Sequence, residues 1–182
     1  TTRKLLSYWL KARYTGWLQK HEEAFTLYEE GFRKACELKD TFWMQEMLME
    51  QGKMYRFVWQ DYSSCTSTFR RIVSLKEQPL HTYSLGLSMA LERNDSAVYY
   101  MNRAAELSML EKDTAQAIFF LRNMMESQIY ALNAYQEAIH TAKRLIQENE
   151  HLRLNNNTLV ESCYDCMTQS YLKMRKLDSA QY

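Results

Sequence analysis

The scarcity of glycine and proline constrains this chain more than any other feature of its sequence. Only 4 Gly and 1 Pro occur in 182 residues, where average usage gives about 13 and about 9. Hairpins and phosphate-binding loops depend on these residues, so the sequence leaves little room for either. Helical periodicity recurs instead, and Leu48, Gly52 and Tyr55 fall on one helical face. The chain is therefore predicted to be all-α.

Short polar turns divide the predicted helices from one another. Asp, Asn and Thr residues in these turns can accept hydrogen bonds from the free N–H groups of the next helix. Pro79 stands where the first turn of a helix tolerates proline, and a further helix is expected to begin near Asp178. Helices are predicted at about 3–17, 21–39, 41–58, 61–76, 79–92, 94–111, 113–131, 134–152 and 156–174.

Small residues recur in the second helix of each predicted pair, and bulky residues recur in the first. The small residues are Ala24, Cys65, Ala97, Ala138 and Ala180, and the bulky ones are Tyr14, Tyr55, Ile129 and Tyr171. A small side chain lets two helices of a hairpin approach closely. The bulky side chains are expected to fill the space between neighbouring hairpins.

Two stretches carry a family resemblance. Leu48-x2-Gln51-Gly52-x2-Tyr55 is followed by Cys65 and Phe69, and Tyr164-x2-Met167-Thr168-x2-Tyr171 is followed by Ala180. This pattern resembles the tetratricopeptide repeat (TPR) family, although the small residues recur every 32 to 42 positions and the family period is about 34. The resemblance implies one domain, 1–182, folded as a right-handed superhelical solenoid of antiparallel helix pairs. It would hold about four and a half units, at 3–39, 41–76, 79–111, 113–152 and a truncated 156–182.

Cys163-Tyr-Asp-Cys166 spells a redox or metal motif, but its position favours packing. A reactive Cys-x-x-Cys lies at a helix N-terminus, whereas this one is expected about two turns inside a helix. A disulfide, a regulatory thiol and a metal site are the alternatives. His21-Glu-Glu-Ala-Phe25 lacks the second ligand of a zinc motif. The chain is therefore predicted to be neither a metalloprotein nor an enzyme, and no cofactor is expected.

Charge and hydropathy narrow the choice of partners. The net charge of +1 lacks the basic excess of a general nucleic-acid binder. No apolar run is long enough to span a membrane. Four irregularly spaced Cys residues favour a reducing, cytoplasmic setting, and an extracytoplasmic sensor region remains the alternative.

A TPR-like solenoid implies a concave groove lined by its first helices. The groove residues expected from the resemblance are Tyr8, Glu46, Lys53, Arg56, Asn123, Ser127, Tyr130, Asp165, Gln169 and Lys173. Their mixture of charge, amide and aromatic groups suits a peptide or a partner protein. The predicted function is a non-catalytic interaction module. The alternative is a ligand-sensing input domain of a larger signalling or transcriptional regulator.

The C-terminal face is expected to lack a partner within the chain. The first helix of the truncated unit would carry Met167, Tyr171 and Met174 on this face. The second helix of that unit is cut off at residue 182. The native protein is therefore expected to continue beyond this residue. The isolated chain could form a weak homodimer through that face.

Overall fold

The chain folds into helices joined by short turns. The computed structural model describes residues 2–152, 154 and 156–179, and side chains only as far as residue 175. The described residues contain no strand, which confirms the all-α prediction. The elements are α1 (Thr2–Trp17), α2 (His21–Glu37), α3 (Thr41–Met54), the π-helical turn η1 (Tyr55–Trp59), α4 (Tyr62–Leu75), α5 (Pro79–Leu91), α6 (Ser96–Leu110), α7 (Thr114–Tyr130), α8 (Tyr135–His151) and α9 (Asn157–Ser179).

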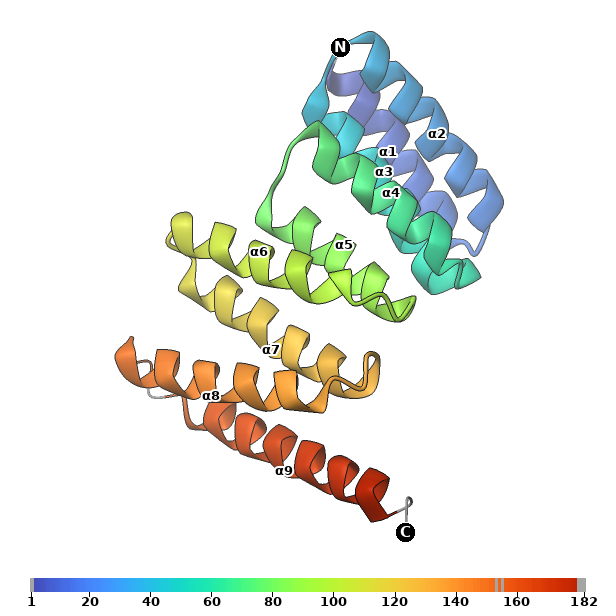
Figure 1. Cartoon of the computed structure of the whole chain (residues 1–182). Coiled ribbons are helices and arrows are strands. Elements are labelled where there is room, and N and C mark those ends of the chain that lie inside the picture. The colour runs from blue at the N-terminus through green and yellow to red at the C-terminus, as the bar shows by residue number, and fades with distance from the viewer. Residues whose placement is uncertain (1, 153, 155, 180–182) are drawn as a thin grey trace. The chain divides into compact units, whose positions relative to one another are not determined.

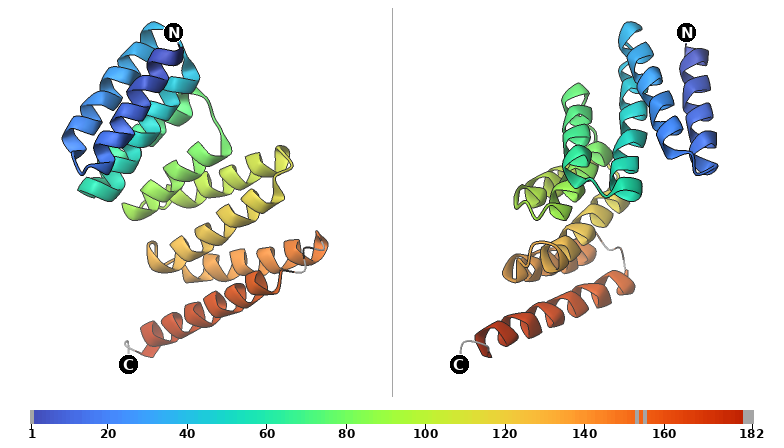
Figure 2. Two further views of the ribbon diagram at one scale, coloured as in Figure 1. Left: turned by 180° about the vertical axis from the view of Figure 1, so that it is seen from behind. Right: turned by 90° about the vertical axis from the view of Figure 1, so that its right-hand side faces the viewer.

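Two compact units make up the chain. Unit 1 is Thr1–Ser88 and unit 2 is Met89–Tyr182, so the division falls within α5. In unit 1 the helices α1 to α4 pack in sequence, each against the next (Figure 1). In unit 2 the helices α6 to α9 do the same, and α7 also contacts α9 (Figure 2). Each unit is thus a row of helices built from neighbours in the sequence.

A recurring turn joins most of the helices. Its first feature is a non-glycine residue with positive φ, which occurs at Gln19, Lys39, Gln60, Arg93, Lys112 and Asn133. In three of these turns an aspartate follows and caps the next helix. Asp40 accepts from Trp43 N at 3.2 Å, Asp61 from Ser64 N at 3.0 Å and Asp113 from Gln116 N at 2.9 Å. These bonds confirm for α3, α4 and α7 that a polar turn residue caps the helix.

The small residues are buried as predicted. Ala24, Cys65, Ala97 and Ala138 are each at most 1% exposed, and Ala180 lies outside the described residues. Gly52 shows why small residues matter here, because a Cβ added to it would lie 2.9 Å from the ring of Phe69. Helices α3 and α4 therefore meet too closely for any side chain at position 52.

The bulky residues divide into two groups. Ile129 is 2% exposed, as a residue that fills the space between hairpins should be. Tyr14 is 63% exposed, so the prediction was wrong for this residue. Tyr171 is 47% exposed, in agreement with the expectation that its face lacks a partner within the chain. Tyr14 shares the outer side of α1 with exposed Leu10, and Tyr171 follows buried Ser170 on α9. Helical spacing places both on faces that no described helix covers.

Two helix ends differ from the prediction. α3 was expected to continue to 58, but it ends at Met54 and the chain continues as η1. α9 was expected to end at 174 with a new helix near Asp178, but it continues to Ser179. The stretch Lys176-Leu-Asp178 contains neither Gly nor Pro. A polar residue alone does not end a helix, so α9 continues through it.

Candidate functional site

The best-formed concavity of unit 1 lies between α1, α2 and the end of α3. We call it the α1–α3 groove, and its volume is about 300 Å³. That volume is at the lower limit of pockets that take small ligands or single side chains of a partner. Its lining residues are Ala12, Arg13, Gly16, Trp17, Gln19, His21, Ala24, Tyr28, Glu50, Lys53, Met54, Phe57 and Val58.

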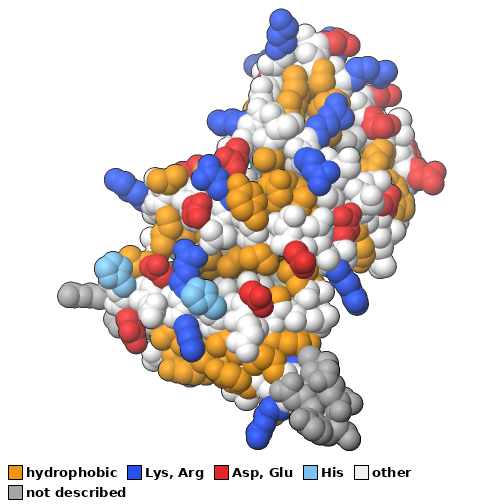
Figure 3. Space-filling view, in the orientation of Figure 1, with side chains coloured by type: hydrophobic (Ala, Val, Ile, Leu, Met, Phe, Trp, Pro, Cys, Tyr) orange, Lys and Arg blue, Asp and Glu red, His pale blue; other side chains and the backbone are white. Residues whose placement is uncertain are grey.

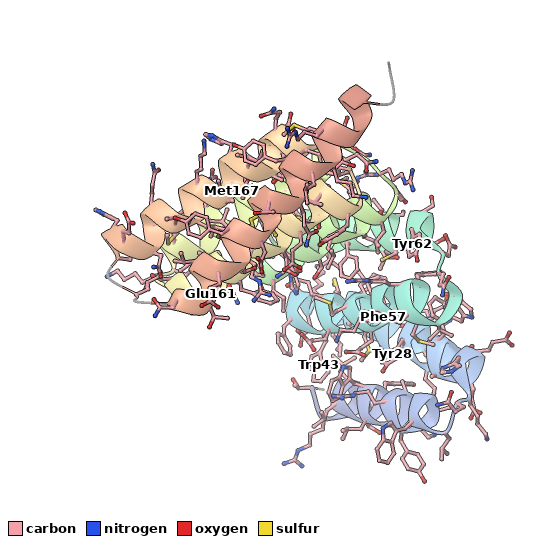
Figure 4. The ribbon with its side chains drawn as sticks, turned by 90° about the horizontal axis from the view of Figure 1, so that it is seen from below. Tyr28, Trp43, Phe57, Tyr62, Glu161 and Met167 are labelled. Carbon is pink, nitrogen blue, oxygen red and sulfur yellow. The ribbon has the colours of Figure 1, made fainter. Side chains whose placement is uncertain are left out.

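The floor of the groove is buried and packed, whereas its rim is open and aromatic. Ala12, Ala24 and Tyr28 belong to the buried core that α1, α2 and α3 share. On the rim, Trp17 is 86% exposed and Phe57 is 67% exposed. Figure 4 labels Tyr28 and Phe57 on two neighbouring helical segments of unit 1. Large aromatic rings that are left in water beside a packed floor are typical of binding surfaces.

The π-helical turn supplies one wall of the groove. Within η1, Tyr55 and Trp59 both pack on Phe25 of α2, with ring centroids 5.3 Å and 5.1 Å from it. This aromatic cluster holds the wide turn against α2. Phe57 and Val58, which lie between these anchors in the sequence, line the groove. π-Helical turns occur often at functional sites, and here the turn supplies two apolar groove residues.

The groove carries one paired and one unpaired cation. Lys53 Nζ lies 2.7 Å from Glu50 Oε1, so these two charges compensate each other. The Arg13 guanidinium lies 4.5 Å from the centre of the Trp9 ring. Within the described residues Arg13 makes no ion pair, which leaves its charge available to a ligand anion.

Burial raises the pKa of two titratable groups near this site. Burial, with a smaller contribution from Glu50, raises the pKa of the Tyr28 phenol well above its ordinary value. Tyr28 therefore keeps its proton at neutral pH and can donate a hydrogen bond. Burial also raises the pKa of Glu46, and Glu50 adds to this while Lys53 opposes it.

The four predicted groove residues of unit 1 lie in different places. Lys53 lines the groove, and the Arg56 guanidinium stacks 4.7 Å from the ring centre of Phe57, a groove residue. Tyr8 packs against the core cluster of α1, α2 and α3. Glu46 is half-buried one helical turn before Glu50. Only Lys53 is thus a lining residue, and Arg56 supports the wall.

The six predicted groove residues of unit 2 lie on α7 and α9. The Tyr130 hydroxyl donates a hydrogen bond of 2.6 Å to Gln169 Oε1, which joins the two helices. Asn123 Nδ2 donates to the Phe119 carbonyl of its own helix at 2.7 Å. Ser127 is half-buried, and Asp165 and Lys173 are exposed. Two of the six are therefore in direct contact, and we call this area the α7–α9 surface.

The two cysteines of the Cys-x-x-Cys motif are buried in unit 2. Cys163 is fully buried and Cys166 is 7% exposed, both on α9. Burial, and next the neighbouring Cys166, raises the pKa of the Cys163 thiol to about 11. Burial is also the largest cause that raises the pKa of Cys166. Such thiols are poor nucleophiles, as the packing interpretation requires.

Sequence reasoning missed most of the groove. Arg13, Gly16, Trp17, Phe57 and Val58 were not among the predicted residues. For Trp17 a signal existed, since Trp17 falls on the same side of a predicted helix as Leu10 and Tyr14. For Phe57 and Val58 no signal existed, because periodicity does not distinguish a π-helical turn from the last turn of an α-helix.

The described residues also lack two other kinds of feature. No group of three or more His, Cys, Asp or Glu side chains that could hold a metal ion occurs there. Over the same residues, no helix combines the length and the hydropathy that crossing a membrane requires. No protein-family model, curated protein or solved structure matches this chain.

Proposed function

We propose that this chain is a non-catalytic, TPR-like interaction module whose α1–α3 groove binds a segment of a partner protein. The observation that carries the proposal is the pairing of a buried floor, Ala12 and Tyr28, with an open aromatic rim, Trp17 and Phe57. Burying two such rings against a partner is a strong source of affinity.

The chemistry of the groove favours a particular segment. A side chain of moderate size fits a space of about 300 Å³, and the rings of Trp17 and Phe57 favour an apolar or aromatic one. The unpaired Arg13 favours a carboxylate next to that side chain. The protonated Tyr28 can donate to a backbone carbonyl. A short extended segment with an apolar anchor and an adjacent acidic residue meets all three conditions.

The helix arrangement agrees with the TPR-like part of the proposal. Small residues are buried in α2, α4, α6 and α8, which are the second helices of the predicted pairs. The glycine of the best-matched motif touches the ring of its partner phenylalanine, Phe69. Within each unit, sequential antiparallel packing is the arrangement that stacked hairpins produce.

Filling the groove is the sharpest test. A Cβ at position 16 would lie 3.6 Å from the Ala24 Cβ, an ordinary contact, so Gly16→Met should fold with its side chain in the groove. Peptides selected from a random display library on the unmodified protein should bind Gly16→Met at least about tenfold more weakly, as expected for losing one buried anchor. Calorimetry with a synthetic copy of a selected peptide gives this ratio.

The matched control is Ser67→Met, on the exposed side of α4 and outside the groove. It should bind the peptide as the unmodified protein does. The double variant Lys53→Glu and Arg56→Glu should also bind the peptide more weakly than the unmodified protein does. Its melting temperature should stay nearly unchanged. Selected peptides that bind Gly16→Met and Ser67→Met equally well would refute the groove as the binding site.

A further inference from the structure

Helix α1 has a second apolar face that lies opposite its packed side. Leu5, Ala12 and Thr15 are buried on the packed side. Leu6, Leu10, Tyr14 and Trp17 lie on the other side and are 43%, 53%, 63% and 86% exposed. We call these four residues the α1 outer stripe. Their spacing of four, four and three residues places them in one continuous row along the helix.

Two open depressions follow this row. The first lies beside Leu6 and Leu10 and is bordered by Arg3, Ser7 and Lys11. The second lies between Trp9, Leu10, Arg13, Tyr14 and Trp17. Both include Leu10, so they form a shallow track along α1. Side chains that protrude at helical spacing from a partner could fill the two depressions in succession.

The charge around the outer stripe has one sign. Arg3, Lys4, Lys11 and Arg13 all lie on α1, which contains no Asp or Glu. Within the described residues none of the four makes an ion pair. The whole chain has 23 Lys and Arg against 22 Asp and Glu, so outside α1 it is net negative. Helix α1 therefore concentrates positive charge in a chain that is otherwise net negative.

We propose that the α1 outer stripe binds an acidic amphipathic helix of a partner protein. The row Leu6, Leu10 and Tyr14 would receive apolar side chains that repeat every three or four residues. Acidic residues that flank those side chains would pair with Arg3, Lys4 and Lys11. Two copies of α1 would bring eight cations together, because each brings four, so the symmetric α1–α1 dimer is disfavoured.

A lipid surface fits the stripe less well than a helix does. An interfacial helix keeps a basic polar face away from its apolar face. In α1 the side opposite the stripe is already buried against unit 1, and the stripe itself is indented at two places. An indented surface receives protruding side chains, which a bilayer does not present.

The test uses three designed peptides as probes. The first is an amphipathic helix with Leu at helical spacing and Glu on both flanks, the second has Lys in place of Glu, and the third is a scrambled acidic peptide. Fluorescence anisotropy with the whole chain should show binding of the first probe alone. High salt should weaken this binding, because the flanking charges are exposed.

Variants locate the binding site. Leu10→Ser should weaken binding of the acidic probe about tenfold or more, as expected for losing one buried leucine. Leu80→Ser is the matched control, because Leu80 on α5 is 50% exposed and Leu10 is 53% exposed. The control should not change binding. The double reversal Arg3→Glu and Lys11→Glu should abolish the salt dependence and shift preference toward the Lys-flanked probe.

Four results would overturn the proposal. The first is equal binding of the acidic and basic probes, and the second is an equal loss of binding in Leu10→Ser and Leu80→Ser. The third is that the chain sediments with phosphatidylserine vesicles but binds no peptide. The fourth is that the chain binds no peptide but self-associates, and that Leu10→Ser abolishes this self-association. The third would assign the stripe to a membrane, and the fourth to a second copy of the chain. Gly16→Met should bind the acidic probe normally, which separates this proposal from the groove.

Discussion

Units 1 and 2 use the same turn but present different surfaces. Asp61 in unit 1 and Asp113 in unit 2 cap the next helix after a residue with positive φ. In unit 1 the first helix of that hairpin ends in a π-helical turn and opens the α1–α3 groove. In unit 2 the Tyr130–Gln169 hydrogen bond joins α7 to α9. The same turn therefore accompanies an open groove in unit 1 and a hydrogen bond between two first helices in unit 2.

Each unit buries a glutamine, and the two differ in their hydrogen bonds. In unit 1, Gln45 is 2% exposed and its Nε2 donates to the carbonyls of Ile72 and Lys76, at 3.1 Å and 2.7 Å. In unit 2, Gln128 is also 2% exposed, but its Oε1 has no hydrogen-bond partner among the described residues. One buried amide stabilises a helix end, and the other is left partly unsatisfied.

The largest expected difference between the units is in the reactivity of their thiols. Cys36 of unit 1 is exposed, whereas burial raises the pKa of Cys163 in unit 2 from 9.0 to about 11. A rise of that size lowers the thiolate fraction near neutral pH about a hundredfold. Iodoacetamide should therefore label Cys36 at least about a hundred times faster than Cys163, as peptide mass spectrometry would measure. The two thiols should react at equal rates only in denaturant. Comparable labelling rates in the folded protein would show that α9 opens readily.

Replacing each buried glutamine by methionine should give effects of different size. Gln45→Met leaves the Ile72 and Lys76 carbonyls without their donor and should lower the free energy of unfolding by about 1–3 kcal/mol. Gln128→Met removes an amide whose oxygen is unsatisfied and should be neutral or stabilising. Urea unfolding of both variants measures the difference. Equal losses would mean that Gln128 makes interactions as valuable as those of Gln45.

Two glycines of unit 1 should respond in opposite directions to alanine. A Cβ on Gly52 would lie 2.9 Å from the Phe69 ring, whereas one on Gly16 would meet only the Ala24 Cβ at 3.6 Å. The clash should outweigh the better helix propensity of alanine, so Gly52→Ala should lose about 1–2 kcal/mol. Gly16→Ala should gain up to about 1 kcal/mol. A stabilised Gly52→Ala would show that α3 and α4 are less tightly packed.

Most of the fold could be predicted from the sequence because it depends on local signals. Caps such as Asp40 and Asp61 and the buried small residues Ala24 and Cys65 are signals that a helix carries within its own few turns. The helix boundaries follow from them within about two residues, except at the ends of α3 and α9. The prediction failed at those two ends because the outcome depends on tertiary contacts or on a missing stop signal.

The candidate site was predicted less well, for a physical reason. Lys53 was identified because the motif at Leu48 fixed its register. Trp17 and Phe57 were not identified, because they belong to the site only through their exposure beside a packed floor. Exposure depends on which neighbouring helix is present and how its last turn is wound. Neither property is encoded in the spacing of apolar residues.

The smallest effect should come from a carboxyl beside the groove. Burial and Glu50 raise the pKa of Glu46 above its ordinary value of 4.5 in the folded protein. The folded state therefore binds the proton more tightly than the unfolded state does. Below the pKa of Glu46 in the unfolded state, the carboxyl is protonated in both states and does not lower the free energy of unfolding relative to a neutral residue. The loss appears as the pH rises through the pKa of Glu46 in the folded state. Glu46→Gln should stabilise unit 1 at neutral pH by less than about 1 kcal/mol, because the side chain is only half-buried.

Urea unfolding across the acid range tests this sign, with Glu126→Gln in unit 2 as the matched control. Glu126 Oε1 lies 3.2 Å from Arg122 Nε on an exposed face, so its replacement should cost up to about 1 kcal/mol at neutral pH. The gain in Glu46→Gln should vanish below pH 4.5, the ordinary pKa of this group. A gain that persists at low pH would mean that shape, and not charge, makes glutamine the better residue. A lower free energy of unfolding at neutral pH would mean instead that the attraction of Glu46 to Lys53 outweighs burial and the repulsion from Glu50 together.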